Sequence, residues 1–262
     1  MKWQLLPLSE QVIVITGASS GTGLRTAKRA AHRGARVVLT ALDESDLRSA
    51  CDEIRADGGR AICVAADVAN PDDVKRIGDT AVAEFGRIDT WVNNAAVSMY
   101  GKTFEIPIED MRRQMDVNFW GHVYGSREAV RQFREHGGAL VNVASGLADR
   151  AIPLQGVHCA AKHAIKAFTD SLRMELEKDG IPISVSLVKP ASIDAPKIAA
   201  DVILRCAETP TREVFATGAA ELITLAGPAE MRPLAAVAGL AALALGALAI
   251  ANRVSPFEPS RL

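Results

Sequence analysis

The sequence predicts an α/β domain built on a doubly wound parallel sheet. A short run of β-branched residues at positions 12–15 leads directly into a glycine-rich stretch, whose glycines are Gly17, Gly21 and Gly23. A continuous apolar run of this length is typical of a strand buried on both faces of a parallel sheet. Further along, short apolar runs alternate with segments of helical composition. This alternation indicates βαβ units with right-handed crossovers.

Composition is consistent with a single large domain. The chain has 262 residues, 48% of them hydrophobic, which is enough to bury a sizeable core. Its formal net charge is −1 and no basic face stands out, which argues against a nucleic-acid partner. Residues 1–10 have one lysine and no long apolar run, so we expect no signal peptide. No CxxC pair is present, so we expect reduced cytoplasmic thiols at Cys51, Cys63, Cys159 and Cys206.

The first half of the chain is expected to form strands at residues 12–15, 36–40, 60–65 and 88–92. Helices are expected between them, at residues 24–34, 44–57 and 71–85. Glycines close the first two helices, as is usual at a helix C-terminus. Asn70, Pro71 and Asp72 are typical of a helix start, because proline suits the first turn and acids favour the positive end of the helix dipole.

The second half repeats the alternation. A long helix is expected at residues 108–135, and Gly137 and Gly138 end it. Strands are expected at residues 139–143, 183–188 and 214–216, with helices at 157–176 and 197–207 between them. In such sheets, ligands bind beyond the carboxyl ends of the strands, where the strand order reverses. The residues at these strand ends should therefore converge on one crevice; they are Gly17, Asp67, Asn93, Ser145 and Pro190.

The glycine-rich stretch is expected to bind a dinucleotide pyrophosphate. Glycines let the backbone bend sharply and approach a ligand, which a Cβ atom would obstruct. The free N–H groups at the start of the following helix favour an anion in the turn. A glycine-rich turn alone is a weak signal, so the rest of the chain has to support this interpretation.

Several motifs together make the chain resemble the short-chain dehydrogenase/reductase family, over about residues 8–218. Residues 16–23 match that family's TGxxxGxG turn, and residues 93–96 resemble its NNAG sequence. Asn118, Ser145 and Lys162 fall at the spacing of three of the four residues in its Asn-Ser-Tyr-Lys catalytic set. The strings Asn-Phe-Trp-Gly from residue 118 and Lys-Pro-Ala-Ser-Ile-Asp from residue 189 resemble bacterial members. The resemblance implies a Rossmann-type fold and an NAD(P)-dependent oxidoreductase.

The resemblance also implies roles for individual residues. Ser145 would polarise the substrate carbonyl or alcohol, Lys162 would bind the nicotinamide ribose, and Asn118 would hold a water that links Lys162 to solvent. Asp67 and Val68 would line the adenine pocket, with Asn93 supporting the adenosine side. No metal site is expected. The cofactor-binding residues carried over from the family are Gly17, Ser19, Ser20, Gly21, Thr22, Gly23, Asp67, Val68, Asn94, Ala95, Lys162 and Pro190.

The chain departs from the family at the acid/base position. The family has a tyrosine four residues before the lysine, and this sequence has His158 there. Histidine can exchange a proton near neutral pH, so it could act in place of tyrosine, although Lys162 would disfavour an imidazolium beside it. The alternative is that His158 only fills the tyrosine's space. The chain would then be a catalytically impaired dinucleotide-binding protein that acts as a sensor or scaffold.

Two further departures concern the cofactor and the substrate cover. Ala41 and Leu42 occupy the positions that usually decide between NAD and NADP, so neither an acid nor an arginine is in place; Arg25 could reach a 2′-phosphate, which favours NADP. A threonine that contacts the carboxamide in the family is Ala195 here. Only about residues 196–212 separate this region from the last strand, so a short lid is expected.

The C-terminal segment is unusually apolar. Residues 233–251 have no charged or strongly polar side chain, and their number is close to the roughly 20 residues that span a bilayer. We expect either a membrane anchor or a helix packed on the domain or at a subunit interface. The expected organisation is a catalytic domain at 1–230 and an apolar segment at 231–262. The protein is expected to be cytoplasmic or membrane-associated through this segment, and the resemblance implies a homo-dimer or tetramer acting on a small-molecule alcohol or carbonyl.

Overall fold

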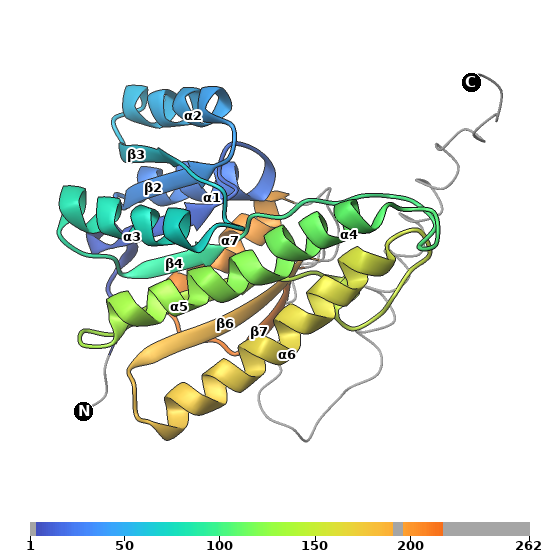
Figure 1. Cartoon of the computed structure of the whole chain (residues 1–262). Coiled ribbons are helices and arrows are strands. Elements are labelled where there is room, and N and C mark those ends of the chain that lie inside the picture. Colours follow the sequence, from blue (N-terminus) through green and yellow to red (C-terminus); the bar gives the residue numbers. More distant parts are fainter. Residues whose placement is uncertain (1–3, 191–195, 217–262) are drawn as a thin grey trace.

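The computed structural model describes residues 4–190 and 196–216. These residues form a seven-stranded parallel sheet in the order β3-β2-β1-β4-β5-β6-β7, with helices on both faces (Figure 1). The order reverses between β1 and β4, so the predicted doubly wound sheet is confirmed. The reversal places the ends of β1, β4 and β5 side by side, and these ends carry most of the predicted site residues.

The described strands are all short, and most of their residues are buried. They are β1 (Val12–Thr16), β2 (Arg36–Ala41), β3 (Arg60–Ala65), β4 (Thr90–Asn93), β5 (Gly138–Val143), β6 (Ile183–Pro190) and β7 (Glu213–Ala216). The α-helices are α1 (Gly21–His32), α2 (Glu44–Ala56), α3 (Pro71–Phe85), α4 (Ile108–Met115), α5 (Gly121–Phe133), α6 (Gly156–Lys178) and α7 (Pro196–Glu208). Three single turns complete the fold: η1 (Leu8–Glu10), η2 (Asp116–Trp120) and η3 (Gly146–Ala148).

The sheet separates two apolar cores. Along β1, Ile13 and Ile15 face the core formed with α1, α2 and α7, whereas Val12 and Val14 face the core formed with α3, α5 and α6. This alternation follows from the two-residue period of a strand, and it requires β1 to be apolar at every position. The continuous apolar run in the sequence therefore reflects a central strand covered on both sides.

Two predicted elements start two or more residues away from their observed starts. Helix α1 begins at Gly21 rather than at residue 24, with Ser20 as its N-cap, so two of the three glycines lie in its first turn. Strand β4 begins at Thr90 rather than at residue 88. Asp89, just before it, accepts a hydrogen bond at Oδ2 from the backbone N–H of Val12 at 2.8 Å.

The long helix predicted at residues 108–135 is not uniform. It is interrupted by the π turn η2, which contains Asn118, and continues as α5. A π turn inserts an extra residue into the helical ladder and is frequent at functional sites. The helical composition of this segment predicts the helix but contains no signal for the change of winding.

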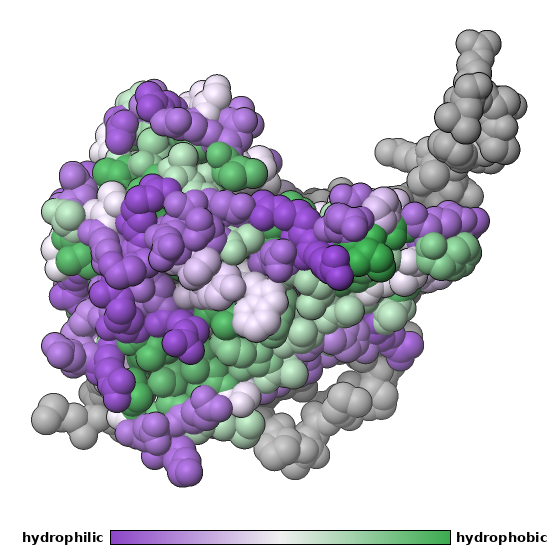
Figure 2. Space-filling model, viewed as in Figure 1, coloured by the Kyte–Doolittle hydropathy of each residue, from purple (hydrophilic) through white to green (hydrophobic). Residues whose placement is uncertain are grey.

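The outer face of α5 and α6 is less polar than the rest of the visible surface. Figure 2 shows polar side chains over much of α3, and apolar and small side chains along α6 and beside α5. Trp91 is fully buried, but Trp120 is 44% exposed and its ring stacks on Tyr124. Trp120 is therefore a surface residue of this face and not part of the core.

Three sequence-based expectations fall on residues outside the described ranges. They concern the apolar segment at 233–251, the domain boundary at residue 230, and Ala195. Among the residues that are described, no helix is both long and apolar enough to cross a membrane.

Candidate active site

The turn after β1 is held in place by close packing between backbone segments. Gly17 has a positive φ of 65°, and a Cβ atom there would lie 2.7 Å from the Cα of Ala95. A Cβ atom on Gly23 would lie 2.2 Å from the carbonyl oxygen of Gly17 and 2.7 Å from Nδ2 of Asn94. Both glycines are therefore required so that the turn, the first turn of α1 and the end of β4 can touch.

Gly21 has a different role from its neighbours. Its φ is 55°, and nothing lies within 4 Å of the position that a Cβ atom would occupy. Ser20, the N-cap of α1, makes no side-chain capping hydrogen bond, and the first turn of the helix contains no acidic residue. The backbone N–H groups at the positive end of α1 therefore point into open space. This arrangement fits a pyrophosphate. Ser19 and Thr22, the other predicted contacts in this turn, lie half-buried beside this opening.

The two asparagines at the end of β4 differ in where their side chains lie. Asn93 is 1% exposed, and its amide donates to the carbonyl of His122 and to Oδ1 of Asn142. Its side chain points into the sheet–helix core and not into the crevice, and its support of the adenosine side stays a prediction. Asn94 is the residue at the turn: its Nδ2 donates to the carbonyls of Thr16 and Gly17 at 2.9 and 3.1 Å.

Thr16 was missed by the role assignments although it belongs to the TGxxxGxG string. Its Oγ1 accepts hydrogen bonds from the backbone N–H groups of Asn94 at 2.9 Å and Ala95 at 3.0 Å. Asn94, Ala95 and Thr16 therefore fasten the glycine turn to the end of β4. They shape the predicted cofactor site, while their own polar groups are largely occupied within the protein.

The predicted adenine pocket at the end of β3 contains an ion pair. Asp67 Oδ2 lies 2.9 Å from Nη1 of Arg113 on α4, and Asp67 Oδ1 accepts the backbone N–H of Ala69. Val68 is buried and packs on Gly121, where a Cβ atom would lie 2.9 Å from the valine side chain. The side chain of Val68 therefore faces the core, whereas Asp67 pairs with Arg113; the place of both residues at the adenine pocket stays a prediction.

The cofactor-deciding positions at the end of β2 carry no charge. Ala41 ends the strand, and the next residue, Leu42, is 67% exposed. Asp43, the nearest acid, is the N-cap of α2, and its Oδ1 accepts the backbone N–H of Asp46 at 2.9 Å. Its carboxylate is therefore committed to the helix start. Arg25 lies exposed on the first half of α1.

Lys162 and His122 meet at the end of β5. Lys162 is 3% exposed, and its Nζ donates to the carbonyl of Val143 at 3.1 Å. Nε2 of His122 lies 3.3 Å from the same oxygen. Burial lowers the pKa of Lys162 to about 8. Burial, with the charge of Lys162, lowers the pKa of His122 to about 3, so His122 is a neutral contact between helix and sheet.

Ser145 lies two residues after Val143, at the N-terminus of η3. Its Oγ accepts the backbone N–H of Leu147 at 3.1 Å, and its backbone carbonyl accepts the N–H of Ala148 at 3.0 Å. The side chain is half-buried and caps the turn. An oxygen that accepts one bond in this way keeps its own O–H free to donate to a substrate oxygen.

His158 lies one helical turn before Lys162 on α6. Burial, followed by the positive charge of Lys162, lowers the pKa of His158 to about 4, and a backbone hydrogen bond with Val97 opposes this only in part. Among the residues that the structure describes, Nδ1 of His158 is buried and has no hydrogen-bond partner. The imidazole is therefore neutral near pH 7, with one ring nitrogen left to exchange a proton.

Asn118 is fully buried in η2, and its side chain is occupied by the loop after β4. Its Oδ1 accepts the backbone N–H of Val97 at 2.8 Å, and its Nδ2 donates to the carbonyl of Val97, also at 2.8 Å. The side chain therefore anchors Val97, the residue that also contacts His158, and the water that the resemblance implies at Asn118 stays a prediction. The π turn is what brings Asn118 to face this loop.

The four cysteines and His163 lie outside the contacts described above. Cys51, Cys63, Cys159 and Cys206 are all free thiols. Across residues 4–190 and 196–216, no group of three or more histidine, cysteine or acidic side chains could hold a metal ion. His163 is exposed on α6, where its Nδ1 lies 2.8 Å from the carbonyl of Cys159.

A buried lysine and its partly buried carboxylate partner were not singled out from the sequence. Lys189 at the end of β6 is 1% exposed, and Glu213 begins β7. Pro190, a predicted cofactor contact, directly follows Lys189 and pairs with Ala216. A lysine at the end of a strand with no other charged residue was the available signal, because a buried charge requires a partner. The partner could not be identified without the tertiary structure.

Comparisons with known proteins agree with this fold. A family model described as short chain dehydrogenase matches residues 11–202. An uncharacterized oxidoreductase of Bacillus subtilis, YxnA, is 44% identical over 251 residues, which cover 86% of this chain and 70% of that protein. The 11-beta-hydroxysteroid dehydrogenase 1A of Arabidopsis thaliana is 37% identical over 189 residues; the match covers 71% of this chain and about half (53%) of the plant protein.

A solved structure extends the agreement to three dimensions. A metagenomic short-chain oxidoreductase in complex with NADP superposes with a TM-score of 0.71 at 30% sequence identity, covering 80% of this chain and 98% of that one. The relatives named as oxidoreductases favour an enzyme over a catalytically silent dinucleotide-binding protein.

Proposed function

This chain belongs to the short-chain dehydrogenase family, and we propose that it oxidises a hydrophobic alcohol with His158 as the proton acceptor. As a member of that family it is an NAD(P)-dependent oxidoreductase that transfers hydride between the nicotinamide and an alcohol or carbonyl substrate. The observation that carries the proposal is the buried, unpaired Nδ1 of a neutral imidazole beside Lys162. A neutral imidazole is ready to take a proton, as alcohol oxidation requires.

The proposed roles follow from the contacts of each side chain. The bound nicotinamide supplies the hydride chemistry. Ser145 donates its O–H to the substrate oxygen and orients it toward His158. His158 Nδ1 accepts the hydroxyl proton, and the contact with Val97 holds the ring. Lys162 is held by one bond to Val143 and has two further N–H groups for the nicotinamide ribose. The backbone N–H groups at Gly21 and the residues beside it hold the pyrophosphate.

The proposal sets the preferred direction of the reaction. Oxidation needs neutral His158, which is the main form above its pKa of about 4. Reduction of a carbonyl needs the imidazolium as proton donor, and its population falls about tenfold for each pH unit above that pKa. At neutral pH the protein should therefore favour oxidation.

A pH profile in both directions tests this proposal. We expect alcohol oxidation to be fastest between about pH 5 and pH 8, because His158 is protonated below this range and Lys162, with a pKa of about 8, loses its charge above it. Carbonyl reduction should rise steadily as the pH falls toward 4. Reduced nicotinamide would be followed by absorbance with a panel of rigid hydrophobic alcohols and ketones. Bound cofactor with no turnover of any alcohol or ketone would contradict the proposed activity.

The hydrophobic character of the substrate is proposed from the loop that faces His158. Val97 is 40% exposed and Tyr100 is 44% exposed on this loop. Gly101 of the same loop donates its N–H to the carbonyl of Leu154, just before α6. The loop is thereby held over the first turn of α6 and presents apolar groups beside His158. The names of the plant relatives, which are hydroxysteroid dehydrogenases, support a bulky apolar alcohol.

We propose NADP as the preferred cofactor. The end of β2 has no free acid to bind a ribose 2′-OH, since Asp43 caps α2. The exposed Arg25 on α1 is available for a 2′-phosphate. The NADP complex of the metagenomic relative supports this assignment.

Changing Ala41 to aspartate should therefore reverse the cofactor preference. We expect Ala41→Asp to weaken NADPH binding at least about tenfold, because a carboxylate beside a phosphate is strongly unfavourable, while NADH binding is kept or improved. Dissociation constants from nicotinamide fluorescence would measure this. Ala41→Asn is the matched control without charge and should change the NADPH-to-NADH ratio little. Equal effects of both variants would contradict the assignment.

The apolar face along α5 and α6 is the proposed contact surface of a homo-dimer or tetramer. It carries the exposed Trp120 and Met174. A cytoplasmic location remains a prediction from the sequence.

A further inference from the structure

A buried lysine ties the Ser145 turn to the edge of the sheet. Lys189 is 1% exposed at the end of β6, and its Nζ lies 2.5 Å from Oδ2 of Asp149. It also forms an ion pair with Glu213 and lies 4.0 Å above the ring centre of Phe215. Asp149 directly follows η3, the turn that Ser145 caps, and its N–H donates to the carbonyl of Gly146. The lysine therefore joins the Ser145 turn to β7.

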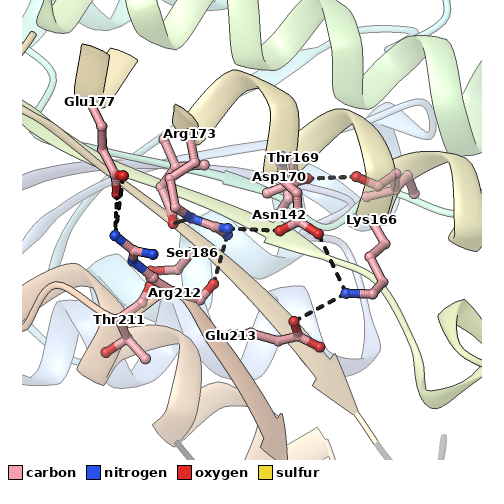
Figure 3. Close-up of polar contacts among 12 residues, drawn as sticks. Asn142, Lys166, Thr169, Asp170, Arg173, Glu177, Ser186, Thr211, Arg212 and Glu213 are labelled. Carbon is pink, nitrogen blue, oxygen red and sulfur yellow. Dashed lines mark hydrogen bonds and ion pairs between the residues drawn. The ribbon is translucent and has the colours of Figure 1, made fainter. Parts of the chain in front are cut away.

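Glu213 has a second cationic partner on the helix that carries His158 and Lys162. Its Oε2 lies 3.2 Å from Nζ of Lys166, one helical turn after Lys162. Lys166 also contacts Asp170, which in turn is 2.7 Å from Arg173 (Figure 3). Figure 3 shows Lys166 reaching from α6 down to Glu213 on the strand, with Asp170 and Arg173 continuing the contacts along the helix.

These contacts converge on one carboxylate. One arm runs from Glu213 through Lys189 and Asp149 to the turn of Ser145, and the other runs through Lys166 to α6. We propose that Glu213 and Lys189 are positioning residues that fix the Ser145 hydroxyl relative to His158 and Lys162. The inference rests on the proposed function. It adds Glu213, which lies outside the quoted motifs, and gives a role to Lys189, which had none.

The physical reason is the charge balance around the buried Lys189. Three cations, Lys166, Arg173 and Lys189, face three anions, Asp149, Asp170 and Glu213. Removing the central negative charge leaves two cations with one partner each, one of them fully buried. Buried ions without enough partners rearrange or recruit water, so both arms should loosen together.

The neighbouring pair of Glu177 and Arg212 provides a matched control. Glu177 also lies on α6 and pairs with Arg212, the residue before Glu213, at 3.1 Å, but both side chains are about half exposed. Glu177→Gln and Glu213→Gln are therefore the same chemical change between the same helix and the same edge of the sheet. Only Glu213 is connected to the Ser145 turn.

Hydrogen exchange tests the proposal without any substrate. In Glu213→Gln, we expect the amides of residues 147–149 to exchange at least about tenfold faster than in the wild type, while Glu177→Gln leaves them unchanged. Asp149→Asn cuts only the arm to Ser145 and should reproduce the faster exchange, which provides the test if Glu213→Gln folds poorly. Lys166→Met should leave this turn at its wild-type rate. Unchanged exchange in both Glu213→Gln and Asp149→Asn would overturn the proposal.

Kinetics then separate positioning from simple stabilisation. Glu213→Gln should lower kcat for alcohol oxidation roughly ten- to a hundredfold, with little change in the KM for the cofactor. In a Ser145→Ala background the same substitution should change kcat less than about twofold, because the group that it positions is already gone. If Glu213→Gln lowers kcat by the same factor with and without Ser145, the proposal is overturned. If the wild type turns over no alcohol, the proposed activity fails, and the exchange experiment alone decides the positioning role.

Discussion

Replacement of His158 by phenylalanine should lower alcohol oxidation at least about a hundredfold and leave cofactor binding close to the wild-type value. The phenyl ring fills the space of the imidazole, but it has no nitrogen to accept the substrate proton. This variant removes the unpaired Nδ1 near the buried Lys162, so its kcat measures what that nitrogen contributes. Turnover of the best alcohol in the panel and fluorescence titration with reduced cofactor would give the two values.

His163→Phe is the matched control for this prediction. His163 lies on the same helix but is exposed, and its ring contacts only its own helix through Cys159. We expect its kcat to stay within about twofold of the wild type, as is usual for a surface substitution. If His158→Phe oxidises alcohols as fast as His163→Phe, His158 does not accept the proton.

Restoring tyrosine should change the direction that the site favours. A phenol is a neutral acid at pH 7, whereas the imidazole of His158 has almost no proton to donate above its pKa of about 4. In His158→Tyr we therefore expect carbonyl reduction at neutral pH to exceed that of the wild type. Reduction that remains equal in both proteins from pH 5 to pH 8 would contradict the assignment of the donor.

Changing Gly23 to alanine should abolish cofactor binding in the accessible concentration range. The new Cβ atom would lie 2.2 Å from the Gly17 oxygen and 2.7 Å from Nδ2 of Asn94, so the turn and the start of α1 must separate. Overpacking of this kind costs about 1–3 kcal/mol of stability, and a displaced turn no longer directs its N–H groups at the pyrophosphate. We expect the Kd for NADPH to rise at least about a hundredfold.

Gly58→Ala separates the loss of binding from a general loss of stability. Gly58 has a φ of 82° and open space at the Cβ position. It lies just after the C-terminus of α2, away from the glycine turn. Alanine in this conformation costs about 1–2 kcal/mol through backbone strain alone. Thermal unfolding should therefore show a loss in both variants, while the Kd for NADPH should change only in Gly23→Ala. An unchanged Kd in Gly23→Ala would contradict the role of the turn.

Local signals in the sequence were sufficient where a residue's own chemistry determines the structure. Helix α3 begins and ends as predicted, because Asn70 caps it, Pro71 suits its first turn, and Gly86 adopts the left-handed conformation that ends it. The strand at residues 60–65 is also confirmed, as is the order of strands and helices. Capping depends on neighbours in the chain, and a buried strand shows as a continuous apolar run, so both can be predicted from the sequence alone.

The sequence by itself determined the doubly wound sheet, the glycine turn and the presence of histidine at the acid/base position. Only the tertiary structure decided that Asn93 points into the core while Asn94 holds the turn, and that a π turn aims Asn118 at Val97. It also decided that the turn of Ser145 reaches α6 through Asp149, Lys189, Glu213 and Lys166. The side chains in these contacts lie 21 to 78 positions apart in the chain. Their pairing is fixed by packing and by the need of buried charges for partners, which no local pattern records.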